Sequence, residues 1–317
     1  MQNHVRWVHF APVCEEDDTL SSTAPVIDHK DLLSSAEALG ALPLTVTRLA
    51  NIVSNPEHDI REIVEVVSLD QALTATLLRR ANSAALGARF QIKTVRDAAL
   101  WLGSGSLLSL ALATSVSRRL SVPIPAYGLA EGQLWKQSVA ASLAAEAIRA
   151  HAGVEVPAES PTAALLHDFG KVVLAQHFGA RVLNMLAQAA VADSLGLLAA
   201  EARVFGINHA DIGGLVAQHW KLPHSIVEAI VHHHHAGEHR SAASATVSLA
   251  HAMVPGIFAG AEKGNGFLPV ACGVTGNPVE THAEVLAGLG IPLDSYDELL
   301  TDARERYTEL ADRYDVA

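Results

Sequence analysis

An adjacent His-Asp pair is the feature of this sequence that most directly suggests chemistry. His167 and Asp168 lie in the segment Ala-Ala-Leu-Leu-His-Asp-Phe-Gly-Lys, which is otherwise apolar. A buried carboxylate is costly unless it is paired or bound to a metal, and neutral imidazole together with carboxylate suits a divalent cation. We expect Gly170 to let the chain turn sharply beside the pair. Lys171 could neutralise a phosphate oxygen.

The pair has a structural interpretation as well. Adjacent residues on a helix point about 100° apart, so both reach one cation only where other helices converge on them. Asp168 could instead accept hydrogen bonds from a neighbouring helix. The residues alone leave both interpretations open.

More histidines follow later in the chain, which contains 17 in all. His209 begins the segment His-Ala-Asp-Ile-Gly, and four consecutive histidines, His232–His235, follow Ile230 and Val231. Histidine near the C-terminal carbonyls of a helix is favourable in any case, and this accounts for part of the run. The remaining imidazoles are candidates to join His167 and Asp168.

Composition favours a helical fold in a reducing compartment. Half of the residues are hydrophobic but only 5% are aromatic, and the excess of Ala and Leu favours helix over strand. Two cysteines allow no disulfide framework, and the first residues do not resemble a secretion signal. We therefore expect an all-α, cytoplasmic protein.

One uncharged stretch, residues 98–117, is long enough to span a bilayer. It contains Gly103-Ser-Gly-Ser106 in its middle, and a helix ending at Gly103 with a second one starting at Ser104 or Ser106 explains it without lipid. No membrane association is expected. Trp101, Trp135 and Trp220 are expected in the core.

Apolar spacing and capping residues predict a chain of short helices. Asp59, Asp70 and Thr94 are expected N-caps, and Pro123 with Pro125 marks the clearest boundary. The predicted helices cover residues 31–39, 42–53, 60–68, 71–82, 95–102, 129–151, 161–169, 171–178, 181–192, 194–205, 208–219, 223–235, 242–258 and 294–313. The chain divides into a flexible tail (1–29), an N-terminal helical part (30–122), a second helical part (123–260), and a loop with a C-terminal helix (261–317).

The charge is unevenly distributed. The net charge of −12 makes non-specific binding of nucleic acid unlikely for the whole molecule. Residues 280–317 carry ten acids and three bases, whereas residues 79–119 carry seven bases and one acid. The basic segment is either a solvated helix face or a surface for a phosphate-bearing ligand or an acidic partner. Its seven bases are Arg79, Arg80, Arg89, Lys93, Arg96, Arg118 and Arg119.

Taken in order, these segments resemble the HD-related output domain family, HDOD. The motifs are Leu-Leu-His-Asp-Phe-Gly-Lys171, His209-Ala-Asp-Ile-Gly with Trp-Lys-Leu-Pro223, and Ala-Ile-Val-His-His-His234. In the N-terminal half, residues 67–83 and 94–103 resemble the same family, so that the match covers about residues 35–255. The resemblance implies a fold similar to HD metal-dependent phosphohydrolases and HD-GYP phosphodiesterases: an HD-like helical bundle with an N-terminal helical bundle packed against it.

The resemblance also implies where metal ligands would lie. Gln137 falls where HD proteins carry a His, and His251 falls where they carry an Asp. His209 and His233 match ligands of the HD-GYP branch, which leaves a reduced site of His167, Asp168, His209 and His233. The Gly-Tyr-Pro segment of that branch is missing after His235, and this counts against hydrolysis of cyclic di-GMP.

The sequence therefore predicts a bacterial regulatory protein of HDOD type that binds a signalling protein partner or a nucleotide-type ligand and does not catalyse. No catalytic residue and no cofactor are assigned, although the reduced site offers ligands for iron, manganese or zinc. The alternative is a metal-dependent phosphohydrolase acting on a nucleotide or cyclic dinucleotide. Lys171 would then stabilise the phosphoryl charge.

Overall fold

The computed structural model describes residues 40–82, 92–178, 183–186, 189, 197–234, 241–259, 282–314 and 316. Within these ranges the chain is helical, and its one β-type contact is an isolated bridge between Ile124 and Leu129. The predicted all-α fold is confirmed. The expected tail, the predicted helix 31–39 and the first part of the loop expected from residue 261 lie outside the described residues.

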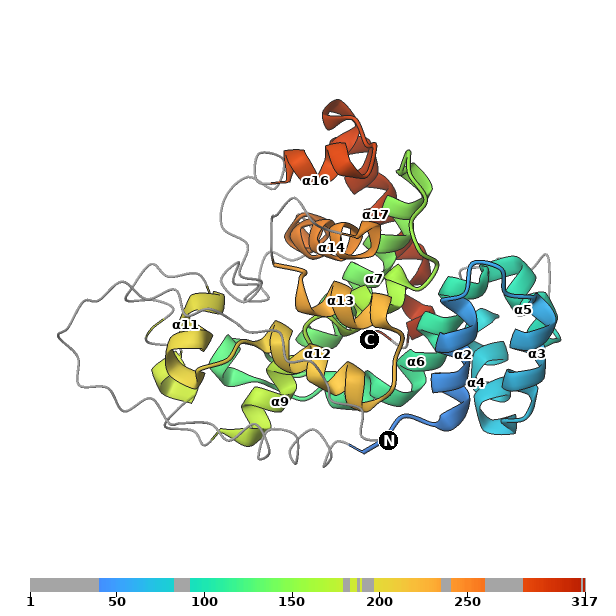
Figure 1. Ribbon diagram of the computed structural model, residues 1–317, viewed down its shortest axis with the longest axis horizontal. Coiled ribbons are helices and arrows are strands. Elements are labelled where there is room, and N and C mark those ends of the chain that lie inside the picture. The colour runs from blue at the N-terminus through green and yellow to red at the C-terminus, as the bar shows by residue number, and fades with distance from the viewer. Residues whose placement is uncertain are drawn as a thin grey trace, which may run out of the picture.

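Four short helices form one end of the molecule (Figure 1, blue to cyan). The predicted caps begin three of them: Asp59 accepts from the backbone N–H of Arg61, Asp70 accepts from that of Leu73, and Thr94 forms a capping box with Asp97. These helices are α2 (Leu44–Val53), α3 (Ile60–Ser68), α4 (Gln71–Ala81) and α5 (Val95–Leu102).

Helix α6 (Ser104–Leu120) joins this end to the rest of the molecule. It packs against α2, α4 and α5, and also against α7 (Gln133–His151) and α8 (Ser160–Leu166). Gly103, at φ 80°, separates α5 from α6 as the sequence predicts, and the two helix axes meet at 118°. Among the described residues no single helix has the length and apolar character to cross a membrane, and α5 with α6 meets that test only as this bent pair.

The second part is built around α7, which packs against α8, α14 and α17 (Figure 1). The turn η2 (Pro125–Tyr127) leads into it. Its remaining helices are α9 (Phe169–His177), α11 (Leu197–Phe205), α12 (His209–His219), α13 (His224–Val231) and α14 (Ala242–Phe258).

The C-terminal elements cover α7 and α14 and extend the same core. They are α16 (Ala283–Gly288), η4 (Leu293–Ser295), α17 (Tyr296–Leu310) and η5 (Ala311–Tyr314). Helix α16 is not foreseen in the sequence. Arg304 of α17 donates two hydrogen bonds, of 2.9 and 2.8 Å, to the carbonyl of Gly256 in α14. One hydrophobic cluster runs from Leu42 to Tyr314.

Two of the three tryptophans expected in the core are buried. Trp135 and Trp220 are each 3% exposed, whereas Trp101 is 59% exposed. The expectation for Trp101 is wrong because the buried stripe of α5 consists of Val95, Ala98 and Ala99. Trp101 therefore lies off the face that meets the neighbouring helices.

Candidate metal centre

His167 and Asp168 lie at a break between two helices. His167 ends α8 and Asp168 begins α9, and each is 1% exposed. The sequence predicts them on one helix, where their side chains would diverge. The break instead brings them together, so that Nε2 of His167 lies 3.3 Å from Oδ2 of Asp168.

Three other segments bring imidazoles to Asp168. His209 is the first residue of α12, and its Nε2 lies 3.2 Å from Oδ1 of Asp168. His233 follows α13, and its Nε2 lies 3.9 Å from the same oxygen. His251 of α14 lies with Nδ1 2.9 Å from Nε2 of His167. The four residues of the reduced site are thus together, with His251 beside them.

Sequence reasoning missed His234 as a member of this cluster. Its Nε2 lies 3.0 Å from Nε2 of His209, and its ring is tilted against that of His233 with 4.0 Å between the centroids. The ligand atoms form two overlapping groups, each within 4.8 Å: His167, Asp168, His233 and His251, and Asp168, His209, His233 and His234. The run of four histidines was the available signal, but it did not show which rings face inward.

Hydrogen bonds on the far side of two rings orient them toward the centre. The Nδ1 atoms of His167 and His233 lie 2.6 and 2.7 Å from the carbonyl oxygens of Ala164 and Ile230. A carbonyl oxygen only accepts, so each Nδ1 donates to it, and Nε2 is the nitrogen that each ring turns toward the centre. Histidines that bind metals show this arrangement, with the outer N–H held by a carbonyl or carboxylate.

Two buried atoms at the centre lack a hydrogen bond among the described residues: Oδ1 of Asp168 and Nε2 of His233. His209 lies at ion-pair distance from that oxygen but without hydrogen-bond geometry. An unsatisfied buried acceptor costs about 1–3 kcal/mol. A divalent cation between the two atoms would satisfy both, and imidazole with carboxylate suits iron, manganese or zinc. The residues present therefore fit a metal.

The charges also favour ligand behaviour. Burial alone would raise the pKa of Asp168, but the neighbouring His167 and Lys171 outweigh it and hold that pKa well below 3.8. Burial, followed by the nearby imidazoles, lowers the pKa values of three histidines well below 6.5: His233, His234 and His251. The centre thus contains an ionised carboxylate beside three rings whose charged form is disfavoured.

Lys171 points into the centre. Its Nζ lies 2.7 Å from Oδ2 of Asp168, and the side chain is fully buried. The ammonium also lies 5.8 Å from the centroid of the Tyr127 ring. The sequence suggests that Lys171 could meet a phosphate oxygen, whereas in the structure it is paired with the carboxylate.

Gln137, which stands where the resemblance implies a His, is buried at 4% exposure on α7. Its Oε1 is among the buried atoms without a hydrogen-bond partner in the described part of the chain. Helix α7 packs closely on α8, which ends directly before His167. Gln137 belongs to neither of the two groups of ligand atoms found among the described residues.

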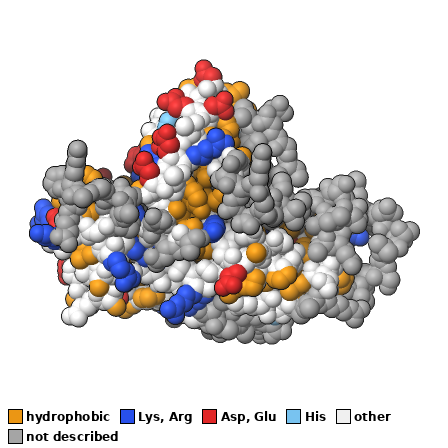
Figure 2. All heavy atoms as spheres, turned by 180° about the vertical axis from the view of Figure 1, so that it is seen from behind, with side chains coloured by type: hydrophobic (Ala, Val, Ile, Leu, Met, Phe, Trp, Pro, Cys, Tyr) orange, Lys and Arg blue, Asp and Glu red, His pale blue; other side chains and the backbone are white. Residues whose placement is uncertain are grey.

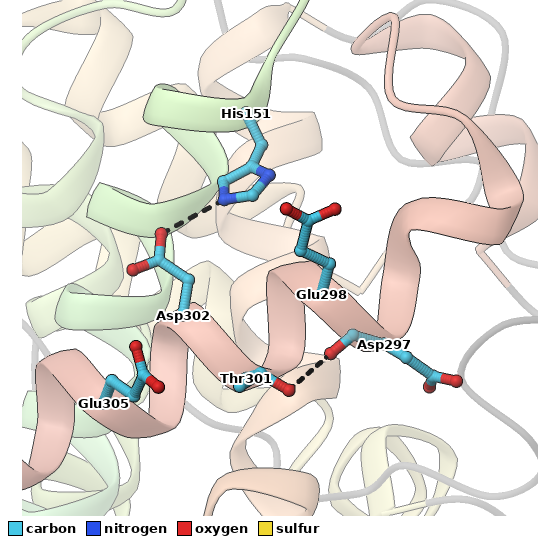
Figure 3. A pocket seen from close by; sticks show the side chains of 6 residues that line it. All are labelled: His151, Asp297, Glu298, Thr301, Asp302 and Glu305. Carbon is cyan, nitrogen blue, oxygen red and sulfur yellow. Dashed lines mark hydrogen bonds and ion pairs between the residues drawn. The ribbon is translucent and has the colours of Figure 1, made fainter.

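A surface pocket of about 570 Å³ lies away from this centre, between the end of α7 and α17 (Figure 3). Its lining is acidic apart from His151 and Thr301, and His151 lies 3.2 Å from Asp302. Figure 2 shows acidic side chains gathered over this end of the molecule. The pocket shares no residue with the His/Asp cluster.

The basic segment presents fewer charges to solvent than its sequence suggests. Arg80 is buried at 5% exposure, Arg119 is half-buried, and Arg89 lies outside the described residues. Four bases are exposed: Arg79, Lys93, Arg96 and Arg118. They leave a solvated surface that is less basic than the count of seven indicates.

Comparison with known proteins agrees with this architecture. The family model of the HDOD domain matches residues 39–236. An uncharacterised protein of Treponema pallidum (strain Nichols) is 26% identical over 217 residues, which cover 67% of this chain and 41% of that protein. The chain thus spans less than half the length of this relative.

Solved structures share the fold. An HDOD domain protein of unknown function from Geobacter sulfurreducens superposes with a TM-score of 0.62 at 24% identity, covering 89% of this chain and 99% of that one. A candidate signal transduction protein from Marinobacter aquaeolei VT8 gives 0.68 at 20% identity, covering 90% and 65%. A candidate phosphohydrolase from Shewanella amazonensis SB2B gives 0.63 at 22% identity, covering 90% and 97%. These identities establish the fold alone. With the family model spanning most of its length, the chain belongs to the HDOD family.

Proposed function

We propose that this protein is a non-catalytic regulator that acts by binding, and that its His/Asp centre holds a divalent cation as part of the fold. One observation carries the proposal: the centre is closed, and one oxygen of its carboxylate, Oδ2, is already paired with Lys171. His167, Asp168, Lys171, His209 and His233 are each at most 1% exposed. Of the clustered residues only His234 is partly exposed, so Asp168 and the rings beside it are closed to a phosphodiester in this arrangement.

Lys171 supports the same conclusion. In a hydrolase, a cationic side chain would stabilise charge that develops on the phosphoryl group. Here the ammonium of Lys171 is 2.7 Å from Asp168 and compensates a buried carboxylate. A signalling protein or a nucleotide-type ligand remains the proposed partner, in keeping with the candidate signal transduction protein of the same fold.

The second candidate function is a metal-dependent phosphohydrolase. The convergence of three Nε2 atoms on Asp168 favours it, since His167, His209 and His233 would hold the cation together with that carboxylate. A bound cation would supply Lewis acidity and lower the pKa of a water molecule. In this chain the surrounding residues orient the rings and exclude solvent.

Metal analysis and an activity screen separate the two functions. Tag-free protein and a His167→Ala, Asp168→Ala double variant would be analysed for iron, manganese and zinc, then assayed with a chromogenic phosphodiester and a cyclic dinucleotide. We expect about one cation per chain, lost in the variant, and no turnover by either protein. Turnover that disappears in the double variant would refute the non-catalytic role. A folded wild type without metal would remove the cation from the proposal.

A further inference from the structure

The segment between α6 and α7, residues 121–132, is called the connector here and contains η2. A chain of hydrogen bonds links it to the His/Asp centre. The hydroxyl of Tyr127, in η2, donates to Oε1 of Glu201 at 2.7 Å. The other oxygen of Glu201, Oε2, lies 2.7 Å from Nδ1 of His209 and accepts from its backbone N–H at 2.9 Å. On the far side of the ring, Nε2 of His209 faces Asp168.

Glu201 is fully buried on α11. A buried carboxylate needs strong partners, and both of its oxygens are used in this chain. Because an ionised carboxylate only accepts hydrogen bonds, Nδ1 of His209 must carry a proton. The Nε2 atom is thereby left to face the cluster, as the carbonyl groups of Ala164 and Ile230 achieve for His167 and His233.

Tyr127 fixes Glu201 from the connector side. The residue is 5% exposed, and its turn is closed by hydrogen bonds from Tyr127 N to Ile124 O and from Gly128 N to Pro125 O. Its ring also lies beneath the ammonium of Lys171. The connector therefore reaches the centre at two places, through Glu201 to His209 and through Lys171 to Asp168.

We propose that Glu201 and Tyr127 are positioning residues of the cation centre. Glu201 fixes the tautomer of His209 and makes its Nε2 a stronger ligand for the cation. Tyr127 holds Glu201 in place and couples the connector to the centre. This inference rests on the cation binding proposed above. Coupling is reciprocal, so cation occupancy protects the connector as much as the connector supports the cation.

Measurements of cation affinity test whether Glu201 positions His209 for the cation. Competition with a chelating dye would give dissociation constants for Mn²⁺ and Zn²⁺ in wild type, Glu201→Gln and Tyr127→Phe. Loss of such an outer partner weakens metal binding about 10–100-fold, which is the change we expect for Glu201→Gln, with a smaller change for Tyr127→Phe. Amide hydrogen exchange at Tyr127 and Gly128 should slow on adding cation to wild type and less so in Tyr127→Phe.

Matched controls separate positioning from general damage. Glu146→Gln changes a half-buried carboxyl on α7, which accepts a hydrogen bond from Ser106 at 2.6 Å. Tyr296→Phe changes another buried phenol, on α17. Both should retain wild-type cation affinity. Equal weakening in the controls would overturn the assignment.

A second readout needs no metal. In the ¹H–¹⁵N spectrum of metal-free protein, the Nδ1 proton of His209 should resonate far downfield because it is shared with a carboxylate, and should move upfield in Glu201→Gln. An unmoved resonance overturns the positioning role whether or not cations bind. If Glu201→Gln shifts the resonance but leaves cation affinity unchanged, Glu201 positions His209 without supporting cation binding, and the proposed role at the cation centre is overturned. A wild type that binds neither cation refutes the cation function, while the resonance still decides whether Glu201 controls His209.

Discussion

Gly170→Ala should separate α9 and α12, two of the helices that position the centre. Gly170 lies in α9 directly beneath the start of α12, and a Cβ at this position would lie 1.9 Å from the carbonyl oxygen of His209 and 2.9 Å from the nitrogen of Gly213. The sequence suggested a turn at Gly170. In the structure the glycine lies within a helix and allows a close approach of two backbones.

The expected cost follows from that contact. Real Cβ atoms essentially never approach closer than 3.0 Å, so α12 must move by at least 1.1 Å, the difference between 3.0 and 1.9 Å. The obstructing atoms are backbone and cannot rotate away. Overpacking commonly costs about 1–3 kcal/mol, and we expect the upper end, about 3 kcal/mol. At an unfolding entropy of about 2.1 cal/mol/K per residue, 317 residues make this a fall of about 4–5 °C in Tm.

Urea and thermal unfolding followed by circular dichroism would measure the change, with Gly288→Ala as the control. Gly288 also lies in a helix, and a Cβ there would meet nothing within 4 Å. The control should stay within about 1 kcal/mol of wild type, in the stabilising direction. If Gly170→Ala unfolds at the same urea concentration as Gly288→Ala, the close approach of α9 and α12 is not as described.

Two further predictions concern the C-terminal helix and pH. Arg304→Ala should lower the free energy of unfolding by about 1.5 kcal/mol because the Gly256 carbonyl loses two charged donors. Arg306→Ala, which removes a half-exposed ion pair with Asp302, should cost less than about 1 kcal/mol, and equal losses would contradict the assignment. Metal-free protein should lose stability as pH falls below 6.5, by at least about 1 kcal/mol per unit, because the unfolded chain then binds protons that buried rings with lowered pKa values do not. These rings are His233, His234 and His251. The pKa of His209 is raised, because Glu201 outweighs the effect of burial. The stability that His209 contributes is therefore fully present below pH 6.5 and does not offset the loss from the other rings. Urea melts at pH 7.5, 6.5 and 5.5 would test this, and a constant midpoint would argue against neutral rings.

Most of the described helices and several of their starts could be predicted because their causes are local, whereas α16 was missed and α7 begins at Gln133 instead of residue 129. Asp59, Asp70 and Thr94 cap the helices that they precede, and Gly103 separates α5 from α6. Such signals depend on residues three or four positions apart. The burial of Trp101 could not be inferred in the same way, because it depends on which face of α5 meets a partner.

The centre was only partly predictable for a related reason. His167, Asp168, His209 and His233 are identified by the family resemblance, but the tautomers of their rings depend on partners elsewhere in the fold. Glu201 receives a hydrogen bond from a residue 74 positions away, and no spacing rule indicates that pairing. Similarly, the inward direction of His234 depends on how α13 ends.

Helix α6 has a mechanical consequence. Its 17 residues form a rod of about 25 Å, with one set of neighbours in α2, α4 and α5 and another in α7 and α8. Helix α6 packs against helices at both ends of the molecule. A hinge motion at residues 121–128 alone would therefore not separate the two ends. Any relative motion of the two ends is therefore expected to be a small sliding of packed helices along α6.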